Sequence, residues 1–90
     1  MEIKHDKKQQ KFYFIQDGKE SYIRYNMPDK ETINLLKTFV PPEQRHKGLA
    51  GEIAKAALEY AKENNLKVIP TCSYVDHFID QNKEYEKLLA

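Results

Sequence analysis

The chain has 90 residues, with 15 lysines and arginines against 14 aspartates and glutamates, and a formal net charge of +1. A chain this short has room for one hydrophobic core, so we predict a single domain over residues 1–90. The balanced charge argues against a nucleic-acid partner, because dedicated nucleic-acid binders concentrate an excess of basic residues on one face. The single cysteine cannot form an internal disulfide, which excludes a disulfide-rich secreted scaffold.

No stretch approaches the roughly 20 apolar residues that a transmembrane helix needs. The polar residues at the N-terminus lack the apolar core of a secretion signal. We therefore expect a cytoplasmic protein without a membrane partner. No group of cysteines and histidines has the spacing of metal ligands, so we expect no metal site.

The first half of the chain predicts four β-strands, over residues 2–6, 11–15, 21–27 and 32–40. Turn signals separate the last three strands, namely Asp17-Gly18 and Pro28-Asp29-Lys30. Apolar and polar residues alternate along residues 21–27, which indicates a sheet with one covered face. The same alternation in residues 32–40 predicts that Ile33, Leu35 and Phe39 lie on one side.

The second half of the chain changes to a helical period. Pro41-Pro42 ends the last strand, and an amphipathic helix follows over Gly48–Asn64. A short strand over residues 66–69 precedes a tail, residues 73–89, that is predicted to be helical in one or two pieces. Strand, helix and strand form a βαβ-like unit. We predict an α+β fold with a mostly antiparallel sheet and a central helix that crosses over to a parallel strand.

Most aromatic residues of the strands are expected in the core. A base-stacking surface would need basic residues beside the rings, and Asp17, Glu20 and Glu31 dilute the positive charge of these strands. His5 lies in the polar segment at the edge of the predicted sheet, and we expect it to have no specific role.

The most informative segment is the loop between residues 40 and 50, Val-Pro-Pro-Glu-Gln-Arg-His-Lys-Gly-Leu-Ala. The first turn of a helix has unpaired N–H groups and a partial positive charge, which together bind anions. Gly48 has no side chain to keep a phosphate away from those N–H groups, and Arg45 and Lys47 add two cations at the rim. The loop therefore predicts a diphosphate site. It lacks the glycines and the serine or threonine of a nucleotide P-loop.

The run from Arg45 to Ala50 resembles the Arg/Gln-x-x-Gly-x-Gly/Ala signature of the GNAT acetyltransferase superfamily. The later segment Pro70-Thr-Cys-Ser-Tyr74 is similar to that of its small, single-domain YjdJ-type members. The resemblance implies a minimal GNAT-like fold and binding of acetyl-CoA. It covers residues 20–85, and the chain is too short for the two helices that usually follow the first strand and for the final hairpin.

The resemblance also implies where acetyl-CoA contacts the chain. Its diphosphate would lie on the N–H groups of residues 45–50, and its pantetheine arm would follow the end of the preceding strand, where that strand separates from residues 66–69. The cofactor-binding residues expected on this basis are Thr38, Phe39, Val40, Arg45, His46, Lys47, Gly48, Leu49 and Ala50. His46 is expected to contribute through its backbone N–H.

Cys72 and Tyr74 are the candidate catalytic residues, because the acetyl group would arrive beside them. A Cys72 thiolate can accept the acetyl group, or the thiol can protonate the departing CoA. The structural alternative is a buried cysteine that only fills space. Tyr74 can donate its hydroxyl to the leaving thiolate, or it can anchor the C-terminal tail.

The sequence thus predicts an acetyl-CoA-dependent N-acetyltransferase that acts on a small-molecule or peptide amine, as a monomer or homodimer. Transfer can occur directly to the amine or through Cys72. Two alternatives remain open, a CoA-binding module without turnover and a small protein-interaction domain that uses the open edge of the sheet.

Overall fold

Five strands form one sheet in the order β1-β2-β3-β4-β5, in a computed structural model that describes residues 2–90. The strands are β1 (Lys4–Asp6), β2 (Lys11–Gln16), β3 (Lys19–Asp29), β4 (Thr32–Phe39) and β5 (Lys67–Ile69). The first four strands pair antiparallel, and β5 pairs parallel to β4. The predicted α+β class with a mostly antiparallel sheet is therefore confirmed.

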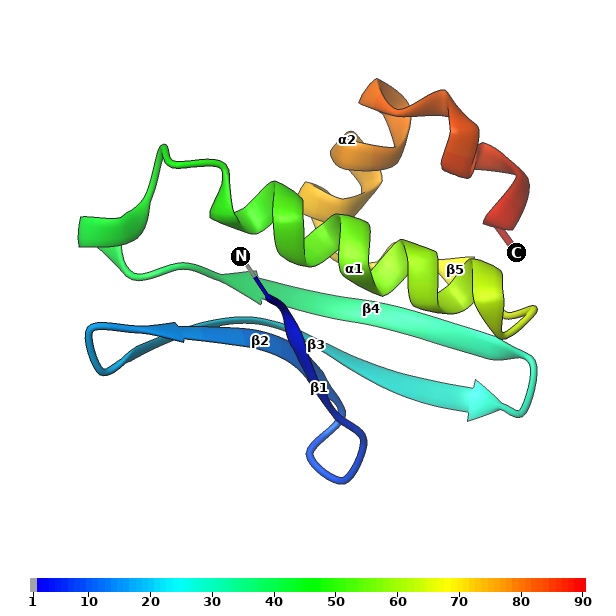
Figure 1. The fold of residues 1–90 in the computed structure, drawn as a ribbon. Coiled ribbons are helices and arrows are strands. Elements are labelled where there is room, and N and C mark those ends of the chain that lie inside the picture. The colour runs from blue at the N-terminus through cyan, green and yellow to red at the C-terminus, as the bar shows by residue number, and fades with distance from the viewer. Residues whose placement is uncertain (1) are drawn as a thin grey trace.

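Two α-helices and two 3-10 helices complete the chain, namely η1 (Pro42–Gln44), α1 (Leu49–Glu63), α2 (Ser73–Gln81) and η2 (Lys83–Leu88). Figure 1 shows α1 lying along β4 over one face of the sheet, with α2 and η2 on the same side. The apolar stripe of α1 is buried against the sheet, and it consists of Leu49, Ile53, Ala54, Ala57, Leu58 and Ala61. Within residues 2–90, no helix combines the length and apolar character that a membrane crossing requires.

Left-handed residues flank both ends of α1. Gly48 is the N-cap, with a φ of 77°, and it turns the chain from the loop into the helix. Asn64 is the C-cap with a φ of −105°, and the left-handed residue is Asn65, with a φ of 56°. The predicted helix boundaries are thus correct to within one residue at each end.

The turn predicted at Pro28–Lys30 is wrong. β3 continues through Pro28 to Asp29, and the chain reverses at Lys30 and Glu31. Proline is tolerated here because β2 pairs with β3 only as far as Arg24, so this end of β3 is an edge on that side. The ladder between β3 and β4 is also irregular between Asn26 and Asp29.

The predicted grouping of Phe39 with Ile33 and Leu35 is also wrong. Tyr25 pairs with Leu35 and Arg24 pairs with Lys37, so Leu36 is an extra residue that forms a β-bulge. Beyond the bulge the alternation of β4 is reversed. Ile33 and Leu35 are fully buried, whereas Phe39 is 37% exposed and contacts Tyr22 on the other face of the sheet.

His5 is part of an aromatic cluster rather than a free edge residue. Its Nε2 lies 2.5 Å from the Tyr25 hydroxyl oxygen. Its ring stacks on Phe12 at a centroid distance of 4.1 Å and meets Tyr60 of α1 edge-on at 4.5 Å. Through the contact between His5 and Tyr60, the cluster packs the short strand β1 against α1.

Candidate cofactor site and active site

The loop between β4 and α1 is shaped by prolines and by left-handed residues. Pro42 begins η1, and the chain then reaches α1 through His46 and Gly48, which have φ values of 65° and 77°. No side chain of residues 2–90 caps the N-terminus of α1. The first hydrogen bond of the helix runs from the Glu52 N–H to the Gly48 carbonyl. The N–H groups of residues 49–51 therefore precede the hydrogen-bonded ladder of α1.

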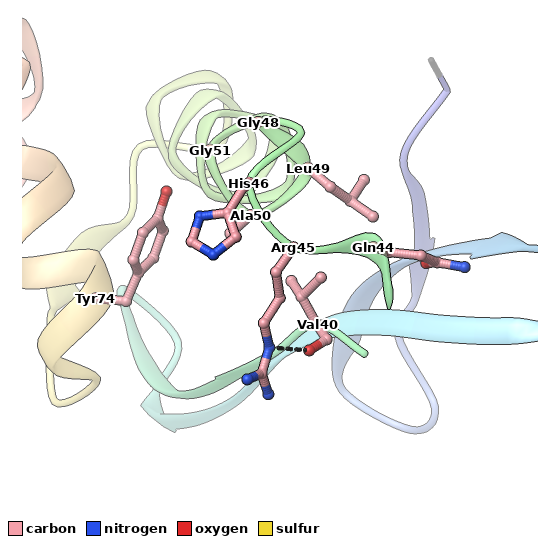
Figure 2. A pocket seen from close by; sticks show the side chains of 9 residues that line it. All are labelled: Val40, Gln44, Arg45, His46, Gly48, Leu49, Ala50, Gly51 and Tyr74. Atoms are coloured by element: carbon pink, nitrogen blue, oxygen red, sulfur yellow. Dashed lines mark hydrogen bonds between the residues drawn. The ribbon is translucent and has the colours of Figure 1, made fainter. Parts of the chain in front are cut away.

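These N–H groups border a hollow of about 230 Å³. Its lining consists of Val40, Gln44, Arg45, His46, Gly48, Leu49, Ala50, Gly51 and Tyr74 (Figure 2). A Cβ atom built on Gly48 would meet no atom within 4 Å, so the space in front of the helix N-terminus is open. The donors and the positive end of the helix dipole make this hollow suitable for a phosphate or diphosphate group.

Arg45 is held beside the hollow by the end of β4. Its Nε donates a hydrogen bond to the Val40 carbonyl oxygen over 2.9 Å, as Figure 2 shows. In the same view the His46 ring lies between the Arg45 and Tyr74 side chains. The guanidinium group keeps its terminal nitrogens as further donors, so it can pair with an anion in the hollow.

The structure brings together most, but not all, of the residues expected to hold the cofactor. Val40, Arg45, His46, Gly48, Leu49 and Ala50 line the hollow, whereas Thr38, Phe39 and Lys47 do not. Lys47 is exposed, and the bulge in β4 directs Phe39 to the opposite face of the sheet. Thr38 lies deeper along β4, beside Cys72.

Sequence reasoning missed two residues of the lining, Gln44 and Gly51. Gln44 is 5% exposed, and its Nε2 donates to the Gln16 carbonyl over 2.8 Å, which ties the loop to β2. A Cβ on Gly51 would meet the Tyr74 hydroxyl at 3.5 Å and Phe78 at 3.6 Å. The absent side chain thus leaves room between the first turn of α1 and helix α2. The position of Gly51, three residues after Gly48 in the first turn of the helix, could have indicated that it lines the site. No local sequence feature distinguishes Gln44.

Cys72 lies where β4 and the segment after β5 separate. β5 ends at Ile69, opposite Asn34, and the Cys72 N–H then donates to the Leu35 carbonyl over 2.9 Å. Beyond this bond β4 continues to Phe39 with no strand beside it on the β5 side, within the part of the chain that the structure describes. Backbone groups of β4 are therefore available to a ligand in the gap.

The Cys72 thiol is buried but surrounded by donors. Its Sγ lies 3.1 Å from the Thr38 hydroxyl, and Cys72 is the N-cap residue of α2. Burial raises the pKa of the thiol. Hydrogen bonds from the Thr38 hydroxyl and from the backbone N–H groups of Val75, Tyr74 and Thr38 outweigh burial and lower that pKa below its usual value. These donors therefore make the thiolate easier to form than in a buried thiol without them.

Tyr74 links the hollow to Cys72. Burial, and then the charge of Cys72, raise the pKa of the Tyr74 phenol. The phenol is consequently protonated at neutral pH and can donate a hydrogen bond. Cys72 itself is 9% exposed and does not line the hollow, whereas Tyr74, two residues further along the chain, does.

Comparison with known proteins gives a consistent set of matches. The family model for GCN5-related N-acetyl-transferase matches residues 11–88. Protein NATD1 of Danio rerio is 32% identical over 84 residues, which are 91% of this chain and 76% of that protein. Protein NATD1 of Homo sapiens is 30% identical over 82 residues, which are 89% of this chain and 73% of that protein.

A solved structure matches the fold over almost the whole chain. It is the NMR solution structure of a GCN5-like protein from Staphylococcus aureus, with a TM-score of 0.78 and 33% sequence identity. The match covers 99% of this chain and 87% of that chain. Both the family match and the structural match include the loop before α1 and the segment that carries Cys72.

Proposed function

Because the chain belongs to the GCN5-related N-acetyltransferase family, we propose that it binds acetyl-CoA in the hollow before α1 and transfers the acetyl group to an amine. The observation that carries this proposal is the open N-terminus of α1, where the N–H groups of residues 49–51 border the hollow. Acetyl-CoA supplies a diphosphate for these donors and a thioester as the source of the acetyl group. Arg45 adds a cation beside the diphosphate.

The gap between β4 and Cys72 supports a place for the pantetheine arm. Thr38 and Val40 are two residues apart and face the same side of the sheet, which the bulge makes the side of the helices, and Thr38 contacts Cys72. The Thr38 N–H donates to Cys72 and the Val40 carbonyl accepts from Arg45, so the Thr38 carbonyl and the Val40 N–H are the groups proposed to pair with the amides of an extended chain. This path runs from the anion site toward the thiol.

The chemistry of Cys72 supports a covalent route. In the first step a Cys72 Sγ–carbon bond forms at the acetyl carbonyl, and the bond between that carbon and the CoA sulfur breaks. Tyr74 stabilises the departing thiolate by donating a hydrogen bond. In the second step the amine nitrogen attacks the acetyl carbon, the Sγ–carbon bond breaks, and the amine proton goes to water. Cys72 returns to its thiolate form, which the Thr38 hydroxyl stabilises.

Calorimetric titration with CoA tests the binding site through a matched pair of variants. Gly48→Glu places a carboxylate where the diphosphate would lie, and we expect it to abolish CoA binding. Gly18→Glu is the control, because Gly18 has a φ of 73°, also has nothing within 4 Å of an added Cβ, and does not line the hollow. Both variants carry the same backbone strain and charge. Equal loss of binding in both, or none in Gly48→Glu, would contradict the proposed site.

Mass spectrometry after incubation with acetyl-CoA tests the covalent route. We expect one added acetyl group on wild-type protein and none on Cys72→Ala. An amine is then expected to remove the acetyl group from the wild type. Amine acetylation by Cys72→Ala at the wild-type rate would instead establish direct transfer. CoA binding without any acetyl product would leave a binding module as the function.

A further inference from the structure

The face of the sheet opposite the helices carries three aromatic residues in one row. The register pairs Tyr13 of β2 with Tyr22 of β3, and Tyr22 with Phe39 of β4. The Tyr22 and Phe39 rings are 5.6 Å apart between centroids, and Phe39 is 37% exposed. Because α1, α2 and η2 lie on the other side (Figure 1), none of these three helices covers this row. We call this surface the open face.

A row of three basic residues lies directly beside the aromatic row, and one of them, Lys11, is buried, with 8% of its surface exposed. In the strand register, Lys11 lies opposite Arg24, and Arg24 lies opposite Lys37. Each of the three is two residues along its strand from the aromatic residue of the neighbouring row. The Arg24 guanidinium is 5.2 Å from the centre of the Tyr22 ring, and the Lys11 Nζ is 5.0 Å from that of Tyr13.

The charge of the open face is predominantly positive around these rows. Lys11 is bound to Glu20 over 2.7 Å. Among residues 2–90, no carboxylate lies within ion-pair distance of Arg24 or Lys37. Lys4, opposite Tyr13, adds a further cation, and Asp6, opposite Lys11, adds a carboxylate. A second copy of the chain docked on this face would bring like charges together. An anionic partner is favoured instead.

We propose that the open face binds single-stranded nucleic acid. An anionic partner that offers flat rings fits this surface, because a row of rings lies next to a row of basic residues. Single strands meet both conditions, since their bases stack on aromatic side chains while their phosphates pair with lysine and arginine. A duplex hides the faces of its bases. The balanced net charge of the chain argued against a nucleic-acid partner. That net charge is a sum over all residues and does not show how the basic residues are distributed over the surface.

Fluorescence anisotropy with a labelled oligouridylate of about ten nucleotides tests the proposal. We expect binding by the wild type, and roughly tenfold weaker binding by Tyr22→Ala, because one stacked base loses its platform. Tyr22→Phe retains the ring and is expected to bind like the wild type. Circular dichroism of both variants checks that the sheet is intact. Equal binding by Tyr22→Ala and the wild type would overturn the proposal.

A paired charge experiment separates the open face from general electrostatic attraction. The double variant Arg24→Gln/Lys37→Gln is expected to weaken binding and to reduce the slope of log affinity against log salt by about 1.4. Lys62→Gln/Lys87→Gln is the matched control, because both lysines lie around a separate hollow near the C-terminal end of α1. Equal weakening by the two double variants would overturn the proposal. So would tighter binding to a duplex, or capture by phosphatidylserine vesicles without affinity for the oligouridylate.

Discussion

At the scale of single residues, hydrogen bonds decide the direction in which the pKa of the Cys72 thiol shifts. A buried thiol without donors would have a raised pKa, and burial does act in that direction here. The Thr38 hydroxyl and three backbone N–H groups reverse the outcome. The lowered pKa of Cys72 therefore depends in part on a residue 34 positions away in the chain, which local sequence context does not reveal.

Replacing Thr38 by valine should reduce the thiolate fraction of Cys72 at neutral pH. The variant loses one hydrogen bond to a charged group, a loss of about 1.5 kcal/mol, and alkylation by iodoacetamide should slow roughly tenfold. The pH profile of alkylation should move to higher pH. Thr38→Ser keeps the hydroxyl and should react like the wild type. A profile that is unchanged in Thr38→Val would show that the backbone donors alone set the pKa.

The His5 cluster should make stability depend on pH. Burial, followed by the charge of Lys7, lowers the pKa of His5, while Asp6 opposes the shift. The folded protein therefore binds the proton less well than the unfolded chain does, so stability is lost as the pH falls below the unfolded pKa of about 6.5. Urea unfolding at about pH 7.5 and about pH 5 measures this loss.

The variant His5→Gln removes the titrating group from the cluster. Its stability should change less between the two pH values than that of the wild type. Tyr25→Phe keeps His5 and the aromatic packing, so it serves as a control in which the pH dependence persists. An equal loss of stability in His5→Gln and wild type would assign the effect to other groups.

At the scale of elements, the contact between α1 and α2 sets the width of the candidate site. Gly51 lies in the first turn of α1, and the Tyr74 and Phe78 side chains of α2 approach it at ordinary contact distances. Glycine is a poor helix former, so Gly51 lowers the stability of α1. In return, its missing side chain leaves space beside the hollow.

Gly51→Ala should stabilise the fold and weaken CoA binding. Alanine is favoured over glycine in a helix by about 0.5–1 kcal/mol, and its Cβ meets no atom closer than ordinary contact. Thermal unfolding measures the first effect, and calorimetry measures the second. Ala54→Gly, a change in the opposite direction within the same helix, should destabilise the protein. A destabilised Gly51→Ala would mean that α2 cannot accommodate the methyl group.

At the scale of the whole molecule, a ligand can contribute a large share of the stability. A 90-residue domain buries a limited core, and its net stability is a small difference between large terms. A ligand that binds only the folded state shifts this balance directly. The proposed cofactor would contact both the N-terminus of α1 and the end of β4, and thus connect the two layers.

CoA at a hundredfold excess over its dissociation constant should stabilise the protein by about 2.7 kcal/mol. For a domain of this size, this corresponds to an increase in the melting temperature of roughly 10–20 °C. Pantetheine, which lacks the diphosphate, should produce a much smaller shift at the same concentration. Equal shifts with both ligands would contradict a dominant role for the N-terminus of α1.

Much of the architecture was predictable from local patterns. Alternation in residues 21–27, the change of period after Gly48 and the prolines at positions 41, 42 and 70 are local signals, and the corresponding elements are present. The helix start at Gly48 also followed from the local pattern, because the helical period begins there, and the structure adds that Gly48 is left-handed. The family resemblance, which rests on residues 45–50 and 70–74, agrees with the comparisons.

The amino-acid sequence by itself therefore determined the order and type of the main elements, the position of the loop before α1 and the family. Only the tertiary structure decided which side chains share a face or a site. The bulge at Leu36 directs Thr38 toward Cys72 and Phe39 toward Tyr22, and strand pairing aligns rings and cations on the open face. The physical reason is that register and bulges arise from the pairing of distant strands, and a shift of one residue reverses every side chain beyond it.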